Sequence, residues 1–93
     1  MNKNCREKYK MKKIVLITGS GFLATAVTKK LIRTQRYNIT ILSRSHPRDA
    51  QLRSFIRERK INFLCADLSD KSSLTPYKNQ LEKVNYLIHL AGV

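Results

Sequence analysis

The chain has 93 residues, of which 42% are hydrophobic. This length allows one small domain with a modest core and excludes a core large enough to enclose a substrate. It contains three glycines and two prolines, which excludes a collagen-like or low-complexity chain. Its two cysteines, Cys5 and Cys65, lie far apart without a neighbouring histidine. This spacing excludes a zinc motif and a disulfide framework, and it favours a reduced, cytoplasmic protein.

The net charge of +13 comes from 19 basic and six acidic residues. Part of the excess lies in residues 1–13, and the rest is spread along the chain without forming one stripe. Nucleic-acid binding needs clustered cations, usually with aromatic side chains that stack on bases, whereas the four tyrosines here are widely separated. We therefore expect no specific nucleic-acid function.

The first ten residues are expected to be a basic, disordered leader, because Met11-Lys12-Lys13 directly precedes the first apolar run. A signal peptide is the alternative, since residues 14–28 carry no charge. Gly19 and Gly21 interrupt that run, which makes a signal peptide a poor match. No stretch approaches the roughly 20 apolar residues of a membrane-spanning helix.

From Ile14 onward, short apolar runs alternate with amphipathic stretches, a pattern typical of βαβ units around a parallel sheet. Strands are predicted at residues 14–17, 37–42, 61–65 and 84–90. Helices are predicted at residues 21–34, after Ser45 and Pro47, and within residues 72–82, where Pro76 must lie in the first turn or break the helix. Residues 11–93 are thus predicted to form one unit, a Rossmann-like three-layer α/β fold with a doubly wound parallel sheet of about four strands.

Each predicted helix has an apolar stripe that should face the sheet. In the second helix, Ser45 is the expected N-terminal cap and Pro47 an early-turn proline. The inward residues are expected to be Leu23, Val27 and Leu31 in the first helix, Leu52, Phe55 and Ile56 in the second, and Leu74, Tyr77 and Leu81 in the third.

The segment Thr18-Gly19-Ser20-Gly21-Phe22-Leu23-Ala24 directly follows the first predicted strand and opens the first predicted helix. Gly19 permits a tight turn, Gly21 allows the backbone to approach a pyrophosphate, and Ala24 is small enough for close packing of helix on strand. The N–H groups at the start of the helix would face the anion. This context predicts dinucleotide binding; a structural turn in another doubly wound protein is the alternative.

The cofactor is predicted from Ser43-Arg44-Ser45, which ends the second strand. An NAD site places an acidic residue about 20 positions beyond the glycines, whereas an NADP site places a cation for the 2′-phosphate there. No Asp or Glu occurs between Gly19 and Asp49, so the sequence favours NADP and leaves NAD possible. Alternatively, Arg44 points into water or stacks on adenine.

Three segments together resemble the extended branch of the short-chain dehydrogenase/reductase superfamily, which contains nucleotide-sugar epimerases, dehydratases and related reductases. The glycine segment is similar to its Thr-Gly-x-x-Gly-Phe-Leu-Gly loop, Asp67-Leu68 to its adenine-contacting pair, and His89-Leu90-Ala91-Gly92 to its fourth-strand cofactor segment. Together with the prediction for the end of the second strand, the resemblance implies these cofactor-binding residues: Gly19, Ser20, Gly21, Phe22, Leu23, Ser43, Arg44, Asp67, Leu68, Ala91 and Gly92.

Two departures from this resemblance bear on activity. The loop is one residue shorter than the family pattern and has Ala24 in place of its last glycine. The family's catalytic Tyr-x-x-x-Lys is expected beyond the fourth strand, and the one such pair here, Tyr9 to Lys13, precedes the first strand. We therefore predict no catalytic residue and no metal ligand in this chain, with His46, Asp67 and His89 as non-catalytic residues.

The sequence thus predicts the NAD(P)-binding, amino-terminal portion of an epimerase/dehydratase-like or reductase-like protein, truncated and not competent for turnover alone. The alternative is a basic, non-enzymatic binding or assembly module on a Rossmann scaffold. The expected partner is a dinucleotide. Self-association is also expected, through an uncovered sheet edge at the first or fourth strand.

Overall fold

Four parallel strands form one sheet in the computed structural model, which describes residues 12–90. The strands are β1 (Lys13–Thr18), β2 (Tyr37–Ser43), β3 (Asn62–Cys65) and β4 (Tyr86–His89). Their order in the sheet is β3-β2-β1-β4, so the chain moves outward from β1 to β3 and then returns to the other side of β1. This reversal is the doubly wound arrangement, and the predicted fold class is confirmed.

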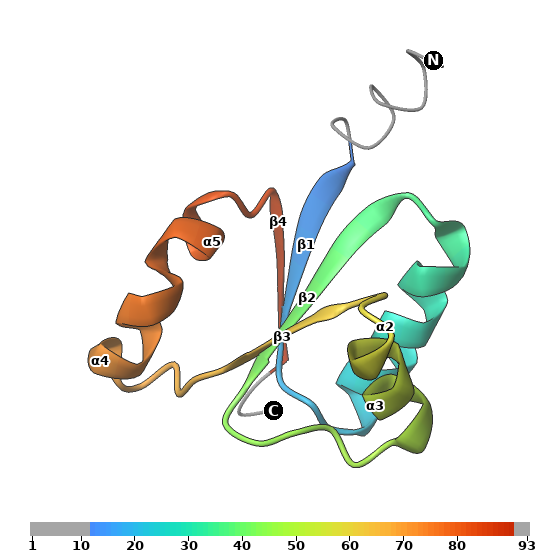
Figure 1. Cartoon of the computed structure of the whole chain (residues 1–93), viewed down its shortest axis with the longest axis horizontal. Coiled ribbons are helices and arrows are strands. Elements are labelled where there is room, and N and C mark those ends of the chain that lie inside the picture. The colour runs from blue at the N-terminus through green and yellow to red at the C-terminus, as the bar shows by residue number, and fades with distance from the viewer. Residues whose placement is uncertain (1–11, 91–93) are drawn as a thin grey trace.

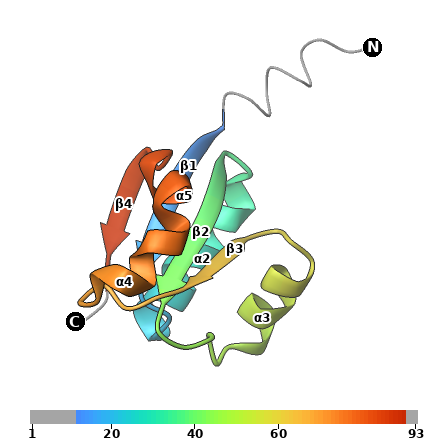
Figure 2. The same cartoon turned by 60° about the vertical axis from the view of Figure 1, so that its left-hand side comes forward.

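Helices cover both faces of the sheet (Figures 1 and 2). Helices α2 (Phe22–Thr34) and α3 (Ala50–Arg57) lie on one face. The other face is covered by α4 (Lys71–Leu74), the 3₁₀ turn η1 (Thr75–Tyr77) and α5 (Lys78–Glu82). Within residues 12–90, every helix is too short or too polar to cross a membrane.

The face beneath α2 and α3 holds the larger part of the core. Successive side chains of a strand point to opposite faces, so alternate residues of β1 and β2 meet on this side. The buried cluster consists of Val15, Ile17, Ala24, Ile39, Ile41, Leu52 and Ile61. Phe55 and Ile56 pack against it, so the predicted inward stripe of the second helix is confirmed.

The opposite face has a smaller core beneath α4, η1 and α5. Leu16, Leu42, Leu64 and Ala66 are buried there. The side chains predicted to point inward from this segment do so: Leu74, Tyr77 and Leu81 pack on that cluster. The predicted third helix is divided into three short pieces, with Pro76 near the start of η1, where the missing N–H of proline costs little.

The buried stripe of α2 differs from the prediction. Leu23 is 51% exposed, whereas Ala24 and Thr28 are buried against the sheet, and Val27 and Leu31 lie partly buried beside them. The two small residues Ala24 and Thr28 thus make the closest contact with the sheet. Each lies one position after a residue of the predicted stripe, Leu23 and Val27. The small side chains let α2 approach the strands closely, and this rotates Leu23 toward solvent.

The start of the second helix also differs from the prediction. The sequence predicts Ser45 as the cap, but α3 begins at Ala50 and is capped by Asp49, whose carboxylate accepts a hydrogen bond from the Leu52 N–H at 3.0 Å. Pro47 lies buried in the preceding loop instead of in the helix. The pKa of Asp49 is lowered, mainly by the hydrogen bond from the Leu52 N–H and also by Lys29, whose ammonium lies 3.2 Å away.

In the part of the chain that the structure describes, the edges of the sheet are β3 and β4, so the alternative that placed β1 at an edge is wrong. On β4, Tyr86 is 52% and Leu87 61% exposed, in agreement with an uncovered fourth strand. Self-association at this edge stays a prediction. The predicted leader, residues 1–10, and the predicted site residues Ala91 and Gly92 lie outside the described residues.

Candidate functional site

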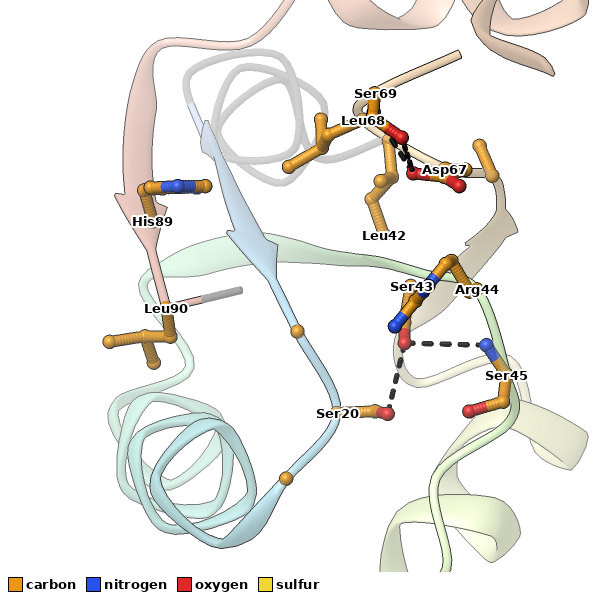
Figure 3. A pocket seen from close by; sticks show the side chains of 13 residues that line it. Ser20, Leu42, Ser43, Arg44, Ser45, Asp67, Leu68, Ser69, His89 and Leu90 are labelled. Carbon is orange, nitrogen blue, oxygen red and sulfur yellow. Dashed lines mark hydrogen bonds between the residues drawn. The ribbon is translucent and has the colours of Figure 1, made fainter. Parts of the chain in front are cut away.

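A cavity of about 500 Å³ opens at the carboxyl ends of the strands (Figure 3). In doubly wound sheets this edge, next to the point where strand order reverses, is where ligands bind. Among the predicted site residues, those that line the cavity are Gly19, Ser20, Gly21, Ser43, Arg44, Asp67 and Leu68. The fold therefore brings the predicted residues that follow β1, β2 and β3 into one cavity.

The glycine loop leads directly from β1 into this cavity. Gly19 has φ of 109°, in the left-handed region that favours glycine, and its N–H donates to the carbonyl of Leu42 at 2.8 Å. Gly21 has φ of −79°, which any residue could adopt. A β-carbon added to Gly21 would meet no protein atom within 4 Å, so its side-chain position faces open space. Packing within the protein does not require glycine there.

Helix α2 starts at this loop without a side-chain cap. The carbonyl of Gly21 accepts the first helical hydrogen bond, from the Thr25 N–H at 2.9 Å, and the first turn contains no acidic residue. The N–H groups of a first turn have no partner inside the helix, and the helix dipole adds positive potential to them. The start of α2 is therefore suited to a phosphate group.

Hydroxyl groups connect the glycine loop to the end of β2. The Ser20 and Ser43 Oγ atoms lie 3.0 Å apart, and the Ser45 N–H donates to Ser43 Oγ at 3.4 Å (Figure 3). The carbonyl of Ser43 accepts the Ala66 N–H at 3.0 Å, which joins β2 to the residue that follows β3. These hydrogen bonds thus connect the segments that follow β1, β2 and β3 where they line the cavity.

Asp67 and Arg44 supply the charges of the cavity. The Asp67 carboxylate accepts from the Ser69 N–H at 2.9 Å and from the Ser69 hydroxyl at 2.7 Å. These bonds lower the pKa of Asp67, and the positive charge of Arg44 lowers it further. Arg44 is exposed, and its carbonyl accepts a weak hydrogen bond from the Cys65 thiol at 3.4 Å. At neutral pH the cavity therefore presents one carboxylate and one guanidinium.

Residues 15–92 match the family described as the saccharopine dehydrogenase NADP-binding domain. The chain belongs to this family. No curated protein matches the chain. The predicted Rossmann-type dinucleotide-binding domain and its preference for NADP are confirmed at the level of the family. The match does not support the narrower resemblance to epimerases and dehydratases.

The residues present fit the cofactor that this family binds. The side-chain position of Gly21 is open, the start of α2 lacks a capping side chain, and a cation follows β2. A pyrophosphate needs the first two features, and a 2′-phosphate needs the third. These three features come from one end of the sheet, as one elongated ligand requires.

Two predicted site residues of this NADP-binding domain lie outside the main cavity. Phe22 is 91% exposed and lines an adjoining cavity, and Leu23 lines neither. Conversely, the predicted set of site residues omitted six residues that do line the main cavity: Leu42, Ser45, Ala66, Ser69, His89 and Leu90. The signal for Ser69 was its spacing of two from Asp67, which is typical of an aspartate that accepts from the backbone two residues on.

His89 lines the main cavity and connects β4 to β1. Its Nδ1 lies 2.7 Å from the hydroxyl of Thr18, and that hydroxyl also accepts the Leu90 N–H at 3.1 Å. The Thr18 hydroxyl donates to His89 Nδ1 when the ring proton is on Nε2, and it accepts from Nδ1–H in the other tautomer. Within residues 12–90, no cluster of His, Cys, Asp or Glu is suited to hold a metal ion.

Proposed function

We propose that this chain binds NADP at the carboxyl edge of its sheet and supplies the cofactor-binding portion of an oxidoreductase. The observation that carries the proposal is that the glycine loop, Arg44 and Asp67 all line one cavity of about 500 Å³. Membership of an NADP-binding family supports the identity of the cofactor.

The pyrophosphate in this proposal lies over the start of α2. Backbone N–H groups of the first turn donate to its oxygens, and the absence of a side chain at Gly21 lets those oxygens approach the backbone. Gly19 holds the turn, through its left-handed conformation and its bond to Leu42. These contacts are common to NAD and NADP, so they do not discriminate between the two.

Discrimination is assigned to Arg44. A carboxylate at this position would accept hydrogen bonds from ribose hydroxyls and repel a 2′-phosphate, whereas a guanidinium attracts that phosphate with charge-assisted hydrogen bonds. The carboxylate of this cavity, Asp67, follows β3 instead and is already engaged with Ser69. It is assigned to the adenosine end of the ligand, with Leu68 beside it.

Hydride transfer in this proposal requires substrate-binding and proton-transfer groups in addition to those of residues 12–90. The epimerase or dehydratase branch is the second candidate, because Asp67-Leu68 and His89-Leu90 line the same cavity. The family match favours a dehydrogenase. The proposed compartment is the cytoplasm, which is supported by the free, exposed thiol of Cys65.

The test is calorimetric titration of the full chain with NADP and with NAD at two salt concentrations. Arg44→Ala should lower NADP affinity by about ten- to a hundredfold and leave NAD affinity nearly unchanged. Arg53→Ala is the matched control, because Arg53 is an exposed arginine of α3 that lines neither cavity. General attraction to a basic chain would weaken for both cofactors alike as salt rises.

Gly21→Val tests the pyrophosphate position. The valine side chain would enter the space that the proposal reserves for phosphate, and no protein atom lies within 4 Å of its β-carbon. Binding of both cofactors should therefore be lost, while the thermal unfolding curve changes little. Equal affinity of the unmodified chain for NAD and NADP, or retained binding by Gly21→Val, would overturn the proposal.

A further inference from the structure

A second cavity, of about 520 Å³, adjoins the first between the start of α2 and the loop that joins β2 to α3. The two cavities share three lining residues, Ser20, Gly21 and Ser45. The second cavity has its own cation, Arg48, and its rim carries the exposed ring of Phe22. A ligand seated over the glycine loop could therefore extend into either cavity.

The backbone on each side of Arg48 is anchored. The His46 ring stacks on Phe63 of β3 at 4.5 Å between ring centroids, and Pro47 is fully buried. On the other side, Asp49 caps α3 and pairs with Lys29 of α2. A cation presented by a fixed loop loses less conformational freedom on binding than one on a mobile loop, so it contributes more to affinity.

The charges near Arg48 leave it available to an anion. The neighbouring carboxylate, Asp49, is engaged with the Leu52 N–H and the Lys29 ammonium. Among residues 12–90, Arg48 forms no ion pair, and its side chain is exposed. Arg44 differs, because its charge acts on Asp67 and lowers the pKa of that carboxyl. Within the described part of the chain, Arg48 therefore forms no ion pair that a bound anion would have to displace.

We propose that the second cavity is a phosphomonoester-binding position in which Arg48, with the Ser20 and Ser45 hydroxyls, holds the 2′-phosphate of NADP together with Arg44. This inference rests on the proposed NADP function and makes Arg48 a second specificity-determining residue. Arg44 lines the first cavity and Arg48 the second, and the phosphate is assigned to their junction, where Ser20 and Ser45 line both cavities.

The experiment compares Arg48→Gln with Arg53→Gln, which removes the same charge from the exposed surface of α3. These two variants are titrated with NADP, NAD, adenosine 2′-monophosphate and adenosine 5′-monophosphate. The same titrations are made with Arg44→Ala and with the double variant that combines Arg44→Ala and Arg48→Gln. Arg48→Gln should weaken NADP and the 2′-monophosphate by about five- to tenfold and leave NAD and the 5′-monophosphate unchanged. Arg53→Gln should change none of the four, and the double variant should bind NADP no better than NAD.

The outcomes separate this inference from the function on which it rests. If Arg48→Gln binds all four ligands like Arg53→Gln, the inference is overturned and the function stands. The inference also fails, and the function again stands, if Arg44→Ala alone removes the whole preference for NADP. If the unmodified chain does not prefer NADP, both are overturned. Unfolding curves for every variant show that affinity is compared between folded proteins.

Discussion

The centre of the sheet and its β4 edge have similar sequences and different surroundings. Both β1 and β4 contain apolar runs, yet Ile17 of β1 is fully buried, whereas Leu87 of β4 is 61% exposed. β1 has a hydrogen-bonded strand on each side and α2 above it, while β4 has a neighbouring strand on only one side within residues 12–90. An apolar run therefore predicts a strand, but the number of neighbours decides how much that strand is buried.

The same difference explains where the candidate site is built. The glycine loop and Arg44 follow β1 and β2, the two central strands, so their positions are fixed by the best-packed part of the protein. The edge strand is held near its carboxyl end by the contacts of His89 and Leu90 with Thr18. We expect substitutions in the two regions to have very different costs.

The largest expected effect is at the centre. Ile41 is fully buried and pairs with Ile17 across β1 and β2, so Ile41→Ala should lower the free energy of unfolding by about 3–4 kcal/mol. Leu87→Ala removes a similar side chain from the exposed edge and should cost less than about 1 kcal/mol. Urea unfolding followed by circular dichroism measures both. A similar loss of unfolding free energy in the two variants would mean that β4 is buried to the same extent as β2.

A smaller effect is expected where the two regions meet. Thr18→Val keeps the shape of the side chain but removes the hydroxyl that contacts His89 and Leu90, which should cost about 1–2 kcal/mol. The Leu90 amide should also exchange with solvent faster, because it loses one of its two acceptors on Thr18. Unchanged exchange at Leu90 would show that this hydroxyl does not hold the edge strand.

A gain in stability is expected beneath α2. The hydroxyl of Thr28 is buried and has no hydrogen-bond partner among the described residues. Thr28→Val replaces this hydroxyl with a methyl group of similar size, and it should raise the free energy of unfolding by about 1 kcal/mol. The thermal unfolding midpoint should rise accordingly. A fall would indicate that the hydroxyl is satisfied in solution, by a bound water for example.

The smallest effect on stability is expected for a charge at the edge. Leu87→Lys should change the free energy of unfolding by less than about 0.5 kcal/mol, because the side chain is already exposed. It should nevertheless suppress self-association, since lysine on an edge strand opposes pairing with another chain. Leu23→Lys is the matched control, because Leu23 is similarly exposed but belongs to helix α2 and not to an edge strand. Light scattering that shows equal association for both variants would contradict a role for β4.

The sequence predicted those parts of the site that depend on local chemistry. Gly19 was identified because a tight turn after a buried strand requires its conformation, and Arg44 because its distance along the chain from the glycines is typical of cofactor sites. Ser45 was assigned the wrong role as a helix cap, since capping residues at 45 and 49 look alike until the helix start is known. Leu23 was misplaced because α2 packs through its small residues instead of its largest ones.

The sequence alone determined the parallel α/β fold of this protein, because apolar runs of strand length alternate with helical stripes, and that pattern has few packing solutions. It also determined the glycine turn, whose requirement is a backbone angle set within a few residues. Only the tertiary structure decided that β4 is an edge, that Asp67 joins Arg44 in one cavity, and that Arg48 lines a second one. These features depend on contacts between segments far apart in the chain, whose relative positions follow from packing and have no local signal.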